Sequence, residues 1–266
     1  MKITAMSTMC GDIFMHTGEI RPGGECLNFA AVACEYPGID VHLLGAIGDD
    51  ECGKKVLESI RNKRIGRDCI HVISGGVTAC NKTYLTEDGD RYYKPDSWNG
   101  GVYATYQLTA QDVKQIVSSD AVFLNYGCAN FDDVLALRKA RDFKLAVDFD
   151  VERDLTKLEA LLPWIDYFFI SGEESLLPVL KGWSERYDGI FNATLAEQGS
   201  VTYLCGQENR VPAVPVSEIV DTTGCGDSYH AGFLCEYART GDVIAAMNEG
   251  SRAASRTLGH LGGFLY

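Results

Sequence analysis

Residues 221–227, near the C-terminal end of the chain, combine an anion-binding turn with a carboxylate that can act as a base. They read Asp-Thr-Thr-Gly-Cys-Gly-Asp, and the apolar run 228–238 that follows is predicted to be helical. Two glycines allow a tight turn that directs several backbone N–H groups at one point, where the positive end of the helix dipole adds to the attraction. These amides would come from Gly224, Cys225 and Gly226. Asp227 would repel a phosphate unless it has another task, and accepting a proton from an attacking hydroxyl is such a task.

A simpler interpretation of this segment is also open. A glycine-rich turn can cap a helix without binding any ligand, and Asp227 would then be an acid in the first turn, where the dipole favours negative charge. Short glycine motifs often match by chance, so the spacing alone does not decide between the two interpretations.

The motif closely resembles the C-terminal signature of the ribokinase-like carbohydrate kinases, Asp-Thr-x-Gly-Ala-Gly-Asp, with Cys225 in place of the usual alanine. Three further segments are similar to that family's signatures and follow in the same order. Residues 23–30 form a Gly-Gly turn that leads into a predicted helix with an asparagine. Residues 41–50 form a predicted strand that ends in Gly-x-x-Gly-x-Asp, and residues 194–195 are Thr-Leu. The resemblance implies transfer of the γ-phosphate of ATP to a sugar hydroxyl. Such a transfer requires a positioned hydroxyl, a base such as Asp227, and positive charge around the phosphoryl group.

On the sugar side, the candidate residues are Asp12, Gly23, Gly24 and Asn28. Asp12 is predicted to follow the first strand, where parallel α/β folds place ligand-contacting loops, and the resemblance implies that it binds sugar hydroxyls. The glycines allow close approach of the backbone to a sugar, and Asn28 offers both a donor and an acceptor. The alternative is a solvated turn aspartate followed by an ordinary helix.

The nucleotide and metal side departs from the family pattern at two positions. The resemblance implies nucleotide contacts at Thr194, Ala196, Gly199 and Gly226. Ala196 stands where the family has glycine. A water-mediated Mg²⁺ contact is implied at Glu174, although Ser171 replaces the asparagine of the family's Asn-x-x-Glu motif. Glu174 has the alternative role of a first-turn helix acid.

The sequence contains two other kinds of residue that bind metal ions in proteins, oxygen-bearing turn residues and histidines. Asp221 and Thr223 resemble positions whose oxygens hold a monovalent cation, such as K⁺, in many members of the family. The five histidines show no metal-binding spacing, so structural or surface roles are predicted for them.

The composition excludes several classes of function. The 266 residues carry a formal net charge of −13, which disfavours binding to nucleic acid and to anionic membranes, because both require a concentrated basic face. No apolar run approaches the length of a membrane span, and the ten cysteines are scattered through apolar patterns, as expected of reduced thiols. We therefore expect a cytoplasmic protein with a small-molecule substrate.

The pattern of elements predicts an α/β fold with a doubly wound, mainly parallel sheet, in a single ribokinase-like domain over residues 1–266. Buried strands are predicted at 41–47, 121–125, 145–149, 167–170 and 189–195. Helices are predicted at 49–63, 109–118, 131–141 and 154–162. Residues 12–22 and 77–100 interrupt this alternation, with a hairpin turn signal at Glu87-Asp88-Gly89-Asp90. We expect them to form a few antiparallel strands, which the resemblance implies to be a β lid that pairs with a second subunit in a homodimer.

The sequence indicates the type of reaction more clearly than the identity of the sugar substrate. Residues 12–14, 23–24, 146–150 and 261–264 are similar to bacterial fructoselysine 6-kinases, a branch of the family that phosphorylates the 6-hydroxyl of a glycated lysine. Glu25, and also Asp150, would then recognise the amine, although both have the alternative of being exposed acids. The sequence leaves two alternative functions open. One is a kinase of ribose, fructose or ketodeoxygluconate, and the other is a noncatalytic sugar-binding protein. A nicotinamide-dependent dehydrogenase is disfavoured, because no Gly-x-Gly-x-x-Gly follows the first strand.

Overall fold

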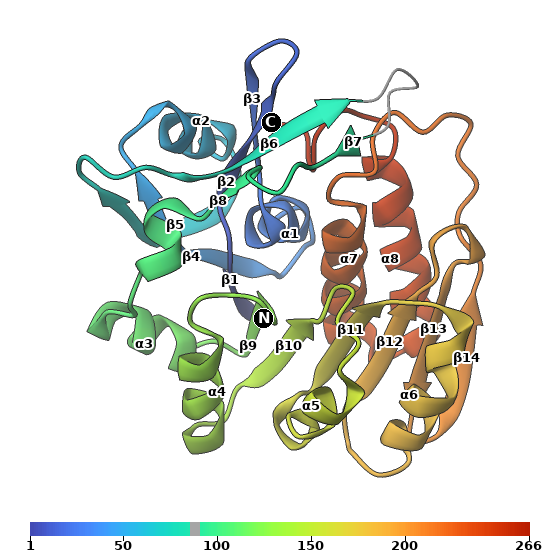
Figure 1. Ribbon diagram of the computed structural model, residues 1–266. Helices are drawn as coiled ribbons and strands as arrows, with labels where there is room; N and C mark the ends of the chain where they lie inside the picture. Colours follow the sequence, from blue (N-terminus) through green and yellow to red (C-terminus); the bar gives the residue numbers. More distant parts are fainter. Residues whose placement is uncertain (86–90) are drawn as a thin grey trace.

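The main element of the fold is a nine-stranded sheet, seen in a computed structural model that describes residues 1–85 and 91–266. In spatial order its strands are β14 (Gln207–Val211), β13 (Ser200–Leu204), β12 (Ile190–Thr194), β11 (Tyr167–Ser171), β10 (Lys144–Asp148), β9 (Ala121–Asn125), β1 (Lys2–Met6), β4 (Asp40–Gly48) and β5 (Ile65–Ile73). Neighbouring strands are parallel except at β13, which runs antiparallel to β12 and β14. The predicted mainly parallel sheet is confirmed (Figure 1).

Helices cover both faces of this sheet (Figure 1). One apolar core is shared with α1 (Glu25–Ala33), α2 (Glu51–Ser59), α7 (Cys225–Thr240) and α8 (Val243–Thr257). The other is shared with α3 (Ala110–Val117), α4 (Phe131–Ala140), α5 (Leu155–Glu159) and α6 (Leu177–Ser184). Phe29 of α1 stacks on Phe123 in the first core, and Trp183 of α6 packs edge-on against Phe168 in the second. Because both faces are buried, the central strands are continuous apolar runs in the sequence.

A second, smaller sheet is built from segments before β4 and after β5. Its strands are β3 (Glu19–Gly23), β2 (Cys10–Phe14), β6 (Ala79–Leu85) and β7 (Arg91–Tyr92), in that order, with β8 (Trp98–Asn99) paired to β6. The pairing of β2 with β6 is parallel, unlike the antiparallel arrangement expected from the sequence. A tight hairpin can join only antiparallel strands, whereas β2 and β6 are joined by a long connection through the main sheet. The predicted turn at residues 87–90 lies outside the described residues.

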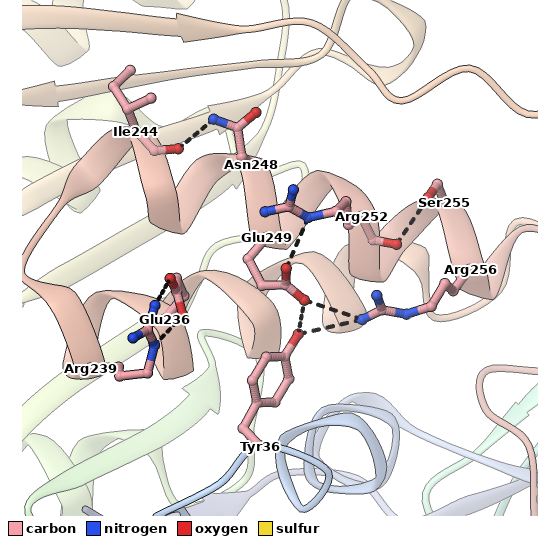
Figure 2. Close-up of polar contacts among 9 residues, drawn as sticks. All are labelled: Tyr36, Glu236, Arg239, Ile244, Asn248, Glu249, Arg252, Ser255 and Arg256. Atoms are coloured by element: carbon pink, nitrogen blue, oxygen red, sulfur yellow. Dashed lines mark hydrogen bonds and ion pairs between the residues drawn. The ribbon is translucent and has the colours of Figure 1, made fainter.

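A polar cluster on the outer surface links α8 to the chain that follows α1, as Figure 2 shows. The carboxylate of Glu249 accepts hydrogen bonds from the Tyr36 hydroxyl at 2.8 Å and from Arg252 at 2.9 Å. Arg256 donates to the same carboxylate at 3.3 Å. These contacts join α8 to the segment after α1, and α7 packs against both helices. None of the helices in the described part of the chain has both the length and the apolar composition that crossing a membrane requires.

Candidate active site

A cleft of about 990 Å³ lies between the two sheets, at the carboxyl ends of the central parallel strands. Three polar residues that line it, Asn125, Asp148 and Ser171, are the last residues of β9, β10 and β11. This is the edge at which open α/β sheets bind ligands. Trp98 and Asn81 line the cleft from the smaller sheet, so a ligand in it would contact both sheets.

The predicted anion-binding turn forms the N-terminus of α7 and lines this cleft. Gly224 precedes the helix with φ of 72°, a left-handed conformation that L side chains rarely adopt, and a Cβ there would lie 2.7 Å from Cα of Gly263. At Gly226 a Cβ would meet no atom within 4 Å, so this part of the backbone borders open space. Cys225 lies between them and is half-buried. The N–H groups of a first helical turn have no partner within the helix, so they are available to an anion.

Asp227 lies in the first turn of α7, is 9% exposed, and lines the cleft. Burial raises the pKa of its carboxyl well above the usual value, and the negative charge of Glu25 raises it further, while a hydrogen bond from Asn28 lowers it. The Asn28 side-chain amide donates that bond to Oδ2 at 2.9 Å. A carboxylate with a raised pKa is a stronger proton acceptor, which suits the predicted role as general base.

Asn28 thus has a contact that the sequence did not predict. Its Oδ1 is buried and has no hydrogen-bond partner among the described residues. A Cβ on Gly263 would lie 2.3 Å from this oxygen, so the C-terminal segment packs tightly against Asn28. The same segment donates the backbone N–H of Gly262 to Asp221 at 2.7 Å. The end of the chain therefore supports both the turn and the residue that orients Asp227.

The other residues predicted on the sugar side also gather here. Asp12 is buried and lines the cleft, but it lies within β2 rather than in a loop after the first strand, because the chain enters the second sheet directly after β1. A Cβ on Gly23 would lie 3.0 Å from Oδ2 of Asp12. Gly24, with φ of 103°, precedes α1, and a Cβ there would lie 2.1 Å from the Thr8 carbonyl oxygen. Both glycines therefore leave room for their neighbours, and Gly24 also lines the cleft.

Glu25, the first residue of α1, is held from two sides. Ser7 donates a hydrogen bond to one carboxylate oxygen and the Asn125 amide donates to the other, each at 3.1 Å. Burial raises the pKa of Glu25, although the bond from Ser7 lowers it. Asp150 also lines the cleft and has φ of 47°, and its N–H donates to Asp148 at 2.8 Å.

The cleft is strongly acidic. Its described lining contains five carboxylic acids and neither lysine nor arginine; the acids are Asp12, Glu25, Asp148, Asp150 and Asp227. Burial raises the pKa of Asp148 to about 7, with a smaller contribution from the charge of Asp150. The arrangement therefore favours a ligand that carries positive charge or many hydroxyl donors.

The residues predicted to contact the nucleotide, apart from Gly226, lie beyond this cleft at the end of β12. The Thr194 hydroxyl is 3.4 Å from that of Ser171, which does line the cleft. Ala196 begins a short 3₁₀ helix (Ala196–Gln198) with φ of 50°, a left-handed conformation that glycine adopts more readily than alanine. Gly199 has φ of 90°, and a Cβ there would lie 2.1 Å from the Val211 carbonyl oxygen. Their contact with a nucleotide stays a prediction.

The predicted cation ligands already have protein partners. Arg210 donates to both carboxylate oxygens of Glu174, at 2.8 and 3.1 Å, and lowers the pKa of this exposed acid. Glu174 is absent from the described lining of the cleft. The carboxylate of Asp221 accepts the N–H groups of Thr223 at 2.9 Å and of Gly262. Their roles toward Mg²⁺ and K⁺ stay predictions.

The lining residues that the sequence did not identify include Asn125, Asp148 and His230. The first two end predicted strands, so the rule that ligands bind at the carboxyl ends of parallel strands would have found them. His230 lies three residues after Asp227 in α7, on the same side of the helix. Its imidazole is buried rather than on the surface, and neither ring nitrogen has a hydrogen-bond partner among the described residues. A structural role for it stays a prediction.

Known proteins match the chain over nearly its whole length. The model of the "pfkB family carbohydrate kinase" matches residues 12–264. The chain is similar to the fructoselysine 6-kinase of Shigella flexneri, with 31% identity over 258 residues and 95% of each chain covered. It is also similar to the fructosamine kinase FrlD of Bacillus subtilis, with 26% identity over 275 residues, 100% of this chain and 94% of that one.

Solved structures agree on the fold. The adenosine kinase from Sinorhizobium meliloti superposes with a TM-score of 0.82 at 19% identity, over 98% of this chain and 95% of that one. The Arabidopsis thaliana ribokinase complexed with ribose and ATP superposes with a TM-score of 0.77 at 18% identity, over 98% of this chain and 93% of that one. The predicted ribokinase-like fold is confirmed by these neighbours. With the family match, they show that this chain belongs to the pfkB family of carbohydrate kinases and is an ATP-dependent sugar kinase.

Proposed function

We propose that the enzyme phosphorylates a hydroxyl of an aminated ketose, with the 6-hydroxyl of fructoselysine as the first candidate. The observation that carries this proposal is the acidic cleft, in which five carboxylic acids and no lysine or arginine are found among the described lining residues. A substrate with an ammonium group compensates such a cleft, whereas a neutral sugar does not. The relatives named fructoselysine 6-kinase and fructosamine kinase support the same class.

In the proposed reaction, Asp227 accepts the proton of the attacking sugar hydroxyl, whose oxygen forms the new bond to the γ-phosphorus of ATP. The bond between that phosphorus and the bridging oxygen breaks, and ADP leaves. Asn28 holds the Asp227 carboxylate in place through its 2.9 Å hydrogen bond. The N–H groups of the first turn of α7, from Gly224 to Asp227, stabilise the charge on the transferring group. Asp12 anchors sugar hydroxyls from the smaller sheet.

On the nucleotide side, we assign Thr194, Ala196, Gly199 and Gly226 to ATP, as the family pattern implies. Mg²⁺ would supply charge neutralisation at the phosphates when bound. The acidic cleft suits a divalent cation, but Glu174 fits a water-mediated contact only if Arg210 releases its carboxylate. A monovalent cation such as K⁺ at Asp221 and Thr223 is the remaining part of the proposal.

The test is turnover with ATP against a panel of acceptors: fructoselysine, fructose, ribose and ketodeoxygluconate. We expect the highest kcat/KM with fructoselysine. A preference for a neutral sugar would overturn the substrate assignment and leave the kinase activity intact. If none of the four acceptors is phosphorylated, fructoselysine is excluded and the acceptor lies outside this panel.

Replacing Glu25 with glutamine should lower kcat/KM several-fold for an aminated ketose and leave that for the matching neutral ketose nearly unchanged. A carboxylate close to an ammonium contributes about 1 kcal/mol in a wet site and more where water is excluded. Glutamine keeps the volume, and its single carbonyl oxygen can still accept the bond from the Asn125 amide, while its NH2 group can donate to the Ser7 hydroxyl. The difference between the two sugars should shrink at high salt. Equal losses with both sugars would contradict recognition of the amine by Glu25.

We also propose that the smaller sheet, with contributions from residues 12–22 and 77–100, is a lid that closes over the sugar. Tyr93 and Trp98 line the cleft from this sheet yet are 52% and 50% exposed, so closure would bury aromatic surface. Saturating sugar should slow amide hydrogen exchange in peptides that cover β6 and residues 92–98, whereas peptides from α8 should be unaffected. Unchanged exchange in both regions during normal turnover would mean that the sheet is a static part of the site.

The exposed edge of the sheet also suits pairing with a second copy, hence a homodimer.

A further inference from the structure

His230 is a polar side chain for which the proposed reaction has no use. It lies in α7, is 1% exposed, and neither ring nitrogen has a hydrogen-bond partner within the described structure. Buried polar groups are nearly always paired, because an unsatisfied one has lost its hydrogen bonds to water without replacement. The imidazole is among the groups that line the cleft. Its unpaired nitrogens therefore point to a ligand that would bind between it and its neighbours.

Two carboxylates face this imidazole. Nδ1 of His230 lies 3.6 Å from Oδ2 of Asp148. One ligand atom from each of Asp148, Asp227 and His230 can be chosen so that all three lie within 4.8 Å of one another. An ion with bonds of about 2.1 Å requires tetrahedral ligands separated by about 3.4 Å, so the three ligand atoms would have to move closer together to surround one ion. Asp148 ends a strand and the other two lie on one helix, so the backbone positions are rigid.

We propose that Asp148, Asp227 and His230 form a binding site for a transition metal ion of the Zn²⁺ type. One imidazole and two carboxylates are donors that suit Zn²⁺, whereas Mg²⁺ prefers oxygen ligands alone and keeps most of its water. Three protein ligands leave a further position open toward the cleft. The ion occupies Asp227, the group proposed to accept the proton, so its binding inhibits the kinase and competes with the sugar.

The binding step is tested without ATP, sugar or turnover, so its outcome does not depend on the proposed function. Calorimetry with Zn²⁺ in excess Mg²⁺ should show one tight site per chain. Co²⁺ at the same site should give visible absorption without a thiolate charge-transfer band. His230→Asn and Asp148→Asn should each weaken Zn²⁺ binding by roughly tenfold or more, the scale on which supporting residues already act at metal sites.

Two variants serve as matched controls. Cys225→Ala removes the half-buried thiol closest in sequence to the site and introduces the residue usual in the family, and His16→Asn removes an exposed imidazole in the smaller sheet's turn. Both should bind Zn²⁺ as tightly as the unaltered chain. Thermal unfolding in the presence of a chelator checks that every variant is folded. The proposal is overturned if Zn²⁺ does not bind, if folded His230→Asn and Asp148→Asn retain full affinity, or if the Cys225→Ala variant alone loses the site.

Discussion

Replacing Asp227 with asparagine should lower kcat by roughly 100-fold to 10,000-fold, the range typical of lost acid–base catalysis. Asparagine preserves the volume, and its carbonyl oxygen can still accept the hydrogen bond from Asn28, but its amide cannot take a proton from the sugar hydroxyl. Sugar and nucleotide affinities should therefore change little. Steady-state kinetics together with calorimetric binding of sugar and of ATP measures both parts of this expectation.

The matched control is Asp132→Asn, which removes an exposed first-turn acid from α4, outside the described lining of the cleft. It should leave kcat unchanged. In the unaltered enzyme, kcat/KM should fall as the pH is lowered through the raised pKa of Asp227, because only the deprotonated carboxylate accepts a proton. Near-normal turnover in Asp227→Asn would remove this residue from the role of base.

Replacing Asp12 with alanine should raise the Kd for the sugar roughly 10-fold to 150-fold. A hydrogen bond to a charged group contributes about 1.5–3 kcal/mol, and each 1.4 kcal/mol is about tenfold in affinity. Asp12 is buried in β2 of the smaller sheet, whereas the nucleotide residues predicted at the end of β12 belong to the main sheet and lie outside the described lining of the cleft. ATP affinity should therefore stay nearly constant, which separate calorimetric titrations with ATP and with sugar can check.

An exposed acid of the same sheet provides the comparison for Asp12. Glu19 in β3 forms a surface ion pair with Arg21, and Glu19→Ala should change neither affinity. The sugar Kd of Asp12→Asn should lie between those of Asp12→Ala and Glu19→Ala. An amide oxygen still accepts a hydrogen bond from the sugar, but it carries no charge. Loss of ATP binding with sugar binding preserved would place Asp12 on the wrong side of the site.

The sequence by itself determined the elements whose signals are local. The main sheet follows from short apolar runs, and the strand predicted at 121–125 coincides with β9. The turn before α7 follows from its glycines. Gly224 has the left-handed conformation that glycine adopts readily, and this preference does not depend on the rest of the fold. Family membership also followed from short motifs, which the match over residues 12–264 confirms. In each case the determining residues are close together in the chain.

Only the tertiary structure decided which distant side chains meet. Asn28 reaches Asp227 across 199 residues of sequence, and Gly262 reaches Asp221 from the last turn of the chain. The sequence could name Asn28 and Asp227 separately, but their hydrogen bond depends on the packing of α1 against α7. The placement of Asp12 within β2 likewise depends on pairing with β6, which lies far along the chain.

The acidity of the cleft is also a property of the folded molecule. Asp148 and His230 carry no motif that predicts a role, yet β10 and α7 bring them within 3.6 Å of each other in a buried site. The pKa of Asp148 rises to about 7 because burial removes water from its carboxylate. Burial and proximity between distant segments are set by packing, and residue types and spacing specify neither.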